Sequence, residues 1–130
     1  MIKVTAVVAL GSAVGAVCRQ ALRDLGLVLG IEATVWSTFS ANASGSLVIG
    51  LLAAVTLQSG RMPLGPMPRQ FLMAGVCGGF TTFSIFSVES VQLLTDGHQV
   101  SAATYMLATL FTCLAACWLG LRVGARPRAS

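Results

Sequence analysis

The sequence predicts an all-α membrane protein, and three observations support that fold class. Hydrophobic residues make up 55% of the 130-residue chain, whereas charged residues make up only 9%. The mean hydropathy is +0.84. Four apolar stretches are each long enough to cross a bilayer. Soluble domains carry about 25% charged residues, so this composition argues against a cytosolic globular domain, a disordered chain and a nucleic-acid-binding protein.

Four transmembrane helices are predicted because a helical span needs about 20 mostly apolar residues. The four stretches cover approximately residues 4–28, 35–57, 71–94 and 102–123. Short connections join them at 30–32, 59–69 and 96–99. The second connection is rich in proline and glycine and is not expected to continue a helix. We therefore predict a single four-span domain over residues 1–130, and a cleaved signal peptide is disfavoured by the charges that end the first stretch.

Basic residues are unevenly distributed between the two sides of the membrane. Four spans place both termini on one side, and that side collects Lys3, Arg61, Arg69, Arg122, Arg126 and Arg128. The opposite side has Arg19 and Arg23, offset by Asp24, Glu32 and Asp96. The positive-inside rule therefore favours both termini in the cytoplasm. The basic residues are too dispersed for a nucleic-acid-binding patch.

Polar side chains inside the first two spans are informative because a polar group at depth is costly. Arg19 lies near one end of the first span, either as an anchor that reaches the interface or as a fixed positive charge at a pore mouth. Asn42 lies in the second span, and Thr38 is one helical turn before it on the same face. An amide at this depth needs partners, so Asn42 is either a link between helices or a donor that lines a polar path.

The third span has the densest polar cluster, with glycines, threonines, serines and phenylalanines crowded between residues 75 and 87. Glycine and β-branched threonine both weaken a helix, so we predict a helix that is broken in mid-membrane. Broken backbone there must be buried by protein or line a cavity. Freed carbonyls could bind a cation, and a freed helix N-terminus could face an anion. Phe80, Phe83 and Phe86 are expected to share one face, as packing or as part of a functional site.

The fourth span carries a thin polar stripe. Tyr105, Thr109 and Cys113 are four residues apart, and Thr112 is adjacent on the same side. The stripe alone establishes little, because a threonine hydroxyl can bond its own backbone. Glu89, in the third span, is either a vestibule residue or a proton-linked carboxylate.

A zinc or redox site is not expected from the cysteines and the histidine. No CxxC pair is present, and the relevant residues are Cys18, Cys77, Cys113, Cys117 and His98. The cysteines lie inside apolar runs, where a thiol acts as a small apolar side chain.

Three segments together resemble the Fluc/CrcB fluoride channel family. They are the glycine–arginine segment at 11–19, the segment around Asn42 and, above all, Gly-Gly-Phe-Thr-Thr-Phe-Ser-Ile-Phe-Ser at 78–87. Their order and spacing match along the whole chain. The resemblance implies a passive channel in the cell inner (plasma) membrane that exports fluoride and lowers its toxicity. It also implies an antiparallel, dual-topology dimer with a structural Na⁺ ion at its centre.

The resemblance also implies roles for individual residues. The backbone carbonyls of Gly78 and Thr81 would bind the sodium ion. The fluoride pore would be formed by Asn42, Phe83, Phe86, Ser84, Tyr105 and Thr109. Glu89 would match a vestibule acid, and Arg19 would match the arginine of the first span. Thr38, Thr112 and Cys113 are further candidates for the polar track.

Three features depart from the family pattern. Ile85 stands where a threonine is common, and Cys113 stands where a serine is common, although a thiol is a weaker donor. Neighbouring Thr112 is a candidate replacement for that serine. The Lys/Arg bias is unusual for a dual-topology homodimer, so the partner is either a second copy, which we favour, or a related chain inserted in the opposite orientation.

Two other functions share some of these features. A small multidrug-type proton-coupled transporter has a similar size, but it normally needs a carboxylate embedded in its first span, where this chain has Arg19. A non-transporting membrane assembly subunit would leave the polar residues at depth unexplained. An enzyme is not expected, because no nucleophile has a plausible base beside it in the sequence.

Overall fold

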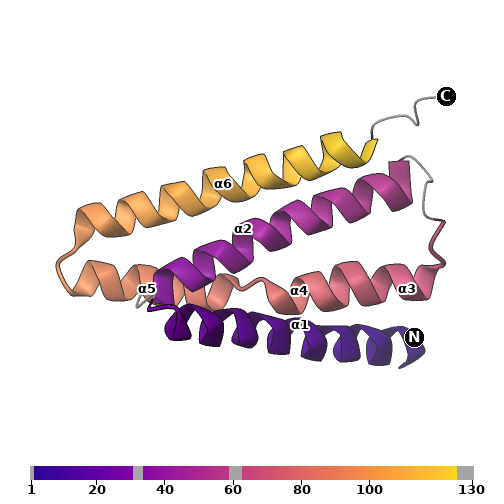
Figure 1. Ribbon diagram of the computed structural model, residues 1–130, viewed down its shortest axis with the longest axis horizontal. Helices are drawn as coiled ribbons and strands as arrows, with labels where there is room; N and C mark the ends of the chain where they lie inside the picture. Colours follow the sequence, from indigo (N-terminus) through magenta and orange to yellow (C-terminus); the bar gives the residue numbers. More distant parts are fainter. Residues whose placement is uncertain (1, 31–33, 59–62, 126–130) are drawn as a thin grey trace.

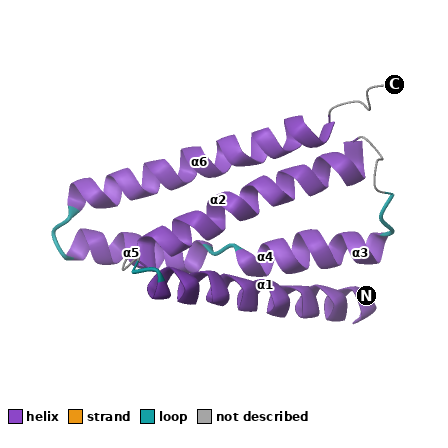
Figure 2. Ribbon diagram, in the orientation of Figure 1, coloured by secondary structure: helices purple, strands orange, loops and turns teal. Residues whose placement is uncertain are grey.

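The computed structural model describes residues 2–30, 34–58 and 63–125, and all regular structure in these ranges is helical (Figure 2). Four helical rods run antiparallel to their neighbours in sequence (Figure 1). The first rod is α1 (Ile2–Val28), and the second is α2 (Thr34–Ala53) continued by the π-helical segment η1 (Ala54–Gln58). The last rod is α6 (Gln99–Ala125). The four rods are long and apolar enough to cross a membrane, as the sequence predicts.

The third rod is built from four segments. They are α3 (Pro66–Gln70), the π-helical segment η2 (Phe71–Cys77), α4 (Gly78–Phe80) and α5 (Phe83–Thr95). Between α4 and α5 the backbone is extended, with φ and ψ of −80° and 158° at Thr81 and −150° and 119° at Thr82. An extended residue turns its side chain through half a revolution, and a helical residue through less than a third. Phe80 and Phe83 therefore do not share one helical face, and the prediction that they do is wrong.

Helix boundaries differ from the sequence prediction by up to five residues, and the start of the third rod differs most. The loop expected at 59–69 ends earlier, because α3 begins at Pro66. A proline is favourable at the first helical position, where its missing N–H would have no intrahelical partner and its fixed φ suits the helix. At the other end of the rod, Gly97 has a φ of 81° and closes α5, which lets α6 begin at Gln99.

The rods pack as two close pairs, in which α2 lies along α6 and α1 lies along η2 and α4. Glycines make both contacts possible. A Cβ atom on Gly15 would lie 2.6 Å from the backbone nitrogen of Phe80, and one on Gly120 would lie 2.7 Å from that of Leu51. Small residues allow such close backbone approach between helices in lipid.

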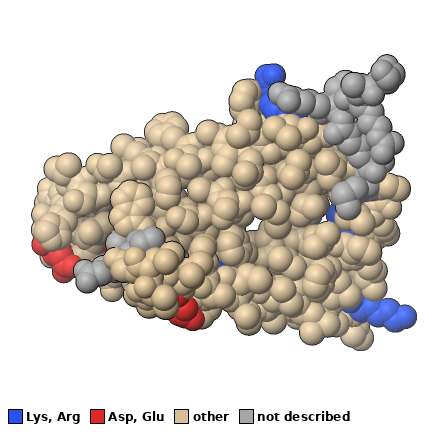
Figure 3. Space-filling model, in the orientation of Figure 1, with Lys and Arg blue, Asp and Glu red and all other residues tan. Residues whose placement is uncertain are grey.

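The outer surface between the two ends of the molecule carries few charged side chains (Figure 3). Large apolar side chains such as Val14, Leu107 and Phe111 are exposed along the rods, as expected for surfaces that face lipid or another chain. The end where α1 begins and α6 ends carries Lys3, Arg69 and Arg122, and the other end carries Asp24 and Asp96. Arg19 and Arg23, the basic residues that the predicted bias assigns to that other side, lie in the second half of α1, and Arg61, Arg126, Arg128 and Glu32 lie outside the described residues.

Candidate functional site

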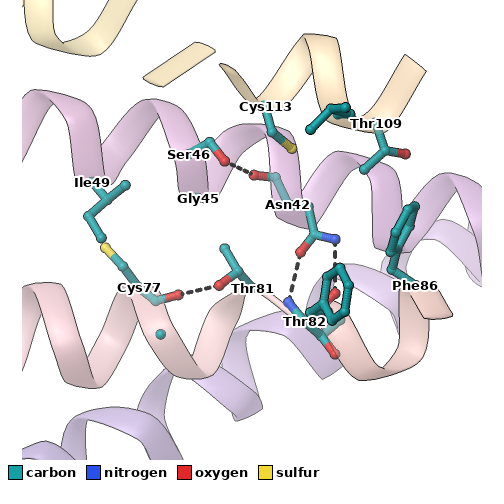
Figure 4. A pocket seen from close by; sticks show the side chains of 13 residues that line it. Asn42, Gly45, Ser46, Ile49, Cys77, Thr81, Thr82, Phe86, Thr109 and Cys113 are labelled. Carbon is teal, nitrogen blue, oxygen red and sulfur yellow. Dashed lines mark hydrogen bonds between the residues drawn. The ribbon is translucent and has the colours of Figure 1, made fainter. Parts of the chain in front are cut away.

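A cavity of about 340 Å³ lies where α2, α5 and α6 meet the interruption of the third rod (Figure 4). It is lined by Asn42, Gly45, Ser46, Ile49, Cys77, Gly78, Thr81, Thr82, Phe83, Phe86, Thr109, Leu110 and Cys113. Seven of these residues belong to the predicted site. The cavity thus gathers polar residues that are far apart in the sequence.

Asn42 is held in place by the interruption itself. Its side-chain Oδ1 accepts a hydrogen bond of 2.7 Å from the backbone N–H of Thr82, and its Nδ2 donates one of 3.0 Å to the Thr82 carbonyl. The amide thereby pairs with the extended backbone as a neighbouring strand would. Of the two alternatives that the sequence left open, the structure shows the link between segments directly. The amide group has a second Nδ2 hydrogen that can also serve an ion.

Thr82 is a cavity residue that the sequence analysis missed. Its Oγ1 accepts a hydrogen bond of 3.2 Å from the backbone N–H of Ile85, so the side chain caps the start of α5. The same oxygen shares a hydrogen bond of 3.2 Å with the hydroxyl of Ser84, which is exposed. A threonine three residues before the N–H that it caps is a recognisable signal for a helix start.

The aromatic side chains form a short continuous row. The ring centroids of Phe83 and Phe86 are 5.7 Å apart, and those of Phe86 and Tyr105 are 5.2 Å apart, all in tilted arrangements. Phe83 is 79% exposed in the single chain, at the open side of the cavity. Ring edges carry the positive part of the aromatic quadrupole, so such a row can offer an anion weak attraction.

Thr109 and Cys113 line the cavity from α6, one turn apart. Thr109 is only 5% exposed, and its Oγ1 has no hydrogen-bond partner within the described ranges. A buried hydroxyl without a partner is costly, which makes it a candidate donor or acceptor for a bound species. The lining residues include Cys113 and not Thr112, so Thr112 does not take the place of Cys113 at this wall.

Glu89 joins three helices through its two carboxyl oxygens. The hydroxyl of Thr38 on α2 donates to Oε1 at 2.9 Å, and the phenol of Tyr105 on α6 donates to Oε2 at 2.7 Å. All three side chains are buried. The sequence singled out these residues separately and gave no sign that they form one network.

A second, much smaller cavity of about 20 Å³ borders this network, and Arg19, Thr38, Ile85 and Glu89 are among its lining residues. The Nε of Arg19 is buried there and has no partner in the described part of the chain. Arg23, which is exposed, lines the same space. Ile85 faces this space rather than the main cavity.

Backbone oxygens are the candidate cation ligands at the interruption. Gly78 and Thr81 both line the main cavity, and a Cβ atom built on Gly78 meets nothing within 4 Å. The neighbouring carbonyl of Cys77 is already occupied, because it accepts hydrogen bonds of 3.0 Å from both the N–H and the hydroxyl of Thr81. Uncharged oxygen ligands of this kind suit a hard cation.

Comparison with known proteins gives a consistent result over most of the chain. Residues 6–121 match the family described as CrcB-like protein, Camphor Resistance (CrcB). A protein of Opitutus terrae called fluoride-specific ion channel FluC is 44% identical over 113 residues, which cover 87% of this chain and 86% of the relative. The corresponding protein of Rhodospirillum rubrum is 42% identical over 120 residues, covering 91% of each chain. Fluoride-specific ion channel FluC 1 of Rhodopseudomonas palustris is 40% identical over 121 residues, covering 93% of this chain and 86% of the relative.

Proposed function

This chain belongs to the CrcB-like family, and on that premise we propose that it is a fluoride-selective passive channel of the bacterial plasma membrane. It lets fluoride leave the cytoplasm and so lowers the toxicity of the ion. Hydrogen fluoride crosses membranes as a neutral molecule and dissociates in a more neutral cytoplasm, which traps the anion. The observation that carries the proposal for this chain is the cavity in which Phe83, Phe86, Asn42 and Thr109 meet.

The proposed path uses several weak partners in succession. The row of Phe83, Phe86 and Tyr105 offers ring edges, and Thr109 offers a buried hydroxyl that has no protein partner in the described residues. Asn42 has one amide hydrogen beyond the one that it donates to Thr82. Conduction requires binding that is strong enough to admit an ion and weak enough to release it. Ser84, Glu89 and Arg19 are proposed to act at the mouths of this path.

We propose that two chains assemble as an antiparallel homodimer around a structural Na⁺ ion, with the interruption of the third rod in mid-membrane. The carbonyls of Gly78 and Thr81 would hold the ion together with the same two carbonyls of the partner. Each chain supplies only two such oxygens, and a two-fold axis would double that number. The 79% exposure of Phe83 supports the dimer, because a large aromatic ring at the open side of a cavity is suited to being covered. When bound, the cation would supply fixed positive charge between the two chains.

Fluoride efflux from liposomes tests the proposal. The purified chain is reconstituted alone into liposomes that contain potassium fluoride or potassium chloride. A potassium ionophore then starts anion efflux, which an ion-selective electrode follows. Fast fluoride efflux without chloride efflux is expected. Replacing Phe83 and Phe86 by isoleucine is expected to slow fluoride efflux by roughly tenfold or more, which corresponds to about 1.4 kcal/mol in the barrier.

The matched control is Phe111→Ile, because Phe111 is an exposed phenylalanine of α6 that does not line the cavity. Its fluoride efflux is expected to equal that of the unmodified protein. Absence of fluoride efflux from well-folded protein would argue for a related partner chain in place of the homodimer. If co-reconstitution with such a chain also failed, the channel proposal would be wrong.

A further inference from the structure

The carbonyls of Gly78 and Thr81, at the interruption, do not receive the hydrogen bonds that a continuous helix would give them. In a continuous helix each N–H donates to the carbonyl four residues earlier, so Thr82 would donate to Gly78 and Ile85 would donate to Thr81. In this structure both N–H groups donate to side-chain oxygens instead. The Thr82 N–H donates to Oδ1 of Asn42 at 2.7 Å, and the Ile85 N–H donates to Oγ1 of Thr82 at 3.2 Å.

We infer that the side chains of Asn42 and Thr82 are positioning residues for the proposed cation site. Each captures the N–H group that would otherwise engage one of the two carbonyls proposed as ligands. Asn42 does so for the carbonyl of Gly78, and Thr82 does so for that of Thr81. The inference rests on the proposed function, because it concerns the cation of that proposal, and it adds two side chains that do not themselves contact the ion.

The contrast with Cys77 supports this assignment. Its carbonyl, one residue before Gly78, receives both the N–H and the hydroxyl of Thr81 at 3.0 Å. A carbonyl that already accepts two hydrogen bonds has both of its lone pairs occupied. The carbonyl of Cys77 thus keeps the N–H donor that a helix would give it, whereas the N–H expected at the next carbonyl, that of Gly78, bonds Asn42 instead.

The Asn42 side chain is itself held in place, as a positioning residue needs to be. Asn42 is 9% exposed and makes two hydrogen bonds to the backbone of Thr82, which fixes the orientation of its amide. The carbonyl of Asn42 accepts a bond of 2.7 Å from Ser46, inside the regular helix α2. A hydrogen bond from a side chain on a regular helix to a non-helical peptide group fixes the direction of that group.

The two carbonyl oxygens proposed as ligands are compatible with the Na⁺ ion that they would hold. Both candidate ligands are neutral backbone oxygens, which hard cations accept. The space beside Gly78 is open, since a Cβ atom there would meet nothing within 4 Å. Access to the Gly78 backbone is therefore not blocked by the chain itself.

Sodium-dependent thermal stability tests the inference without measuring ion flux. The full chain in detergent is titrated from choline chloride into sodium chloride at constant ionic strength, and the midpoint of the rise in Tm is recorded. Thr82→Val removes the accepting oxygen and keeps the side-chain shape, whereas Thr82→Ser keeps the hydroxyl. The matched control is Thr56→Val, which removes a hydroxyl that bonds only the carbonyl of Leu52 in the described structure.

Thr82→Val is expected to raise the sodium midpoint by roughly tenfold or more, whereas Thr82→Ser and Thr56→Val are expected to keep it near that of the unmodified protein. Asn42→Leu is expected to raise it as well, and it carries the test if Thr82→Val does not fold. An unchanged midpoint in the folded Thr82→Val or Asn42→Leu protein would overturn the inference.

Failure of the cation site and failure of the channel remain distinguishable. If the unmodified protein shows no sodium-dependent rise in Tm, the inference is overturned together with the proposed cation site. Fluoride efflux from the same preparation then shows whether the channel function survives. Fluoride efflux from a protein that sodium does not stabilise would support the channel proposal and contradict only the proposed cation site.

Discussion

Tyr105 and Glu89 are joined by a buried hydrogen bond of 2.7 Å, in which the phenol of α6 donates to the carboxyl group of α5. Thr38 completes the arrangement by donating from α2 to the other carboxyl oxygen. Removing one donor leaves a buried carboxyl oxygen without its partner, at a cost that is larger than the value of the bond itself.

Tyr105→Phe is therefore expected to lower the free energy of unfolding by about 1–3 kcal/mol. The measurement is the unfolding midpoint in detergent, by circular dichroism. Thr104→Val is the control, since Thr104 is exposed on the same helix. A Tyr105→Phe protein as stable as the control would show that the network does not stabilise the fold.

Thr109→Val, unlike Tyr105→Phe, is not expected to destabilise the protein. The hydroxyl of Thr109 is buried without a partner in the described structure, so replacing it by a methyl group removes an unsatisfied polar group and is expected to leave stability unchanged or higher by about 1 kcal/mol. Fluoride efflux is nevertheless expected to fall, because the proposed path loses a hydroxyl. A loss of stability with unchanged efflux would assign Thr109 to packing alone.

Gly15→Ala is expected to destabilise the contact between α1 and the third rod. Its Cβ atom would lie 2.6 Å from the backbone nitrogen of Phe80, and neither backbone can move freely. Overpacking of this kind costs about 1–3 kcal/mol. Gly26→Ala is the control on the same helix, where the nearest atom would be 3.5 Å away. Equal Tm values for the two variants would mean that the helices separate easily.

Cys113→Ser is expected to speed fluoride efflux. A hydroxyl is a stronger donor than a thiol, and a gain of about 1 kcal/mol in the transition state corresponds to about fivefold in rate. Cys18→Ser, at an exposed position on α1, serves as the control for a general effect of serine. Slower efflux from Cys113→Ser than from this control would contradict a donor role at this wall.

The four spans could be predicted from the sequence because their apolar length is a local property. The start of α3 at Pro66 could not, because proline both ends helices and begins them, and only the neighbouring structure decides which. The predicted alignment of Phe80 with Phe83 assumed helical geometry through Thr81 and Thr82, where the backbone is extended.

Much of the candidate site could also be named in advance, but the contacts between its members could not. Asn42, Thr109 and Cys113 stand out in the sequence as polar residues in apolar spans, and they line the cavity. Thr38 and Glu89 are 51 residues apart, so no local pattern pairs them. The roles of the site residues in conduction, the sodium ion and the dimer stay predictions that the experiments above address.

The pairing of Asn42 with Thr82 has a consequence for how the protein is made. The second span is synthesised before the third, and its amide provides the partner that the extended backbone of Thr82 needs. Without that partner, a peptide group in lipid is best satisfied by a continuous helix. The interruption therefore depends on contact between the two spans, and a third span separated from Asn42 is expected to form a continuous helix.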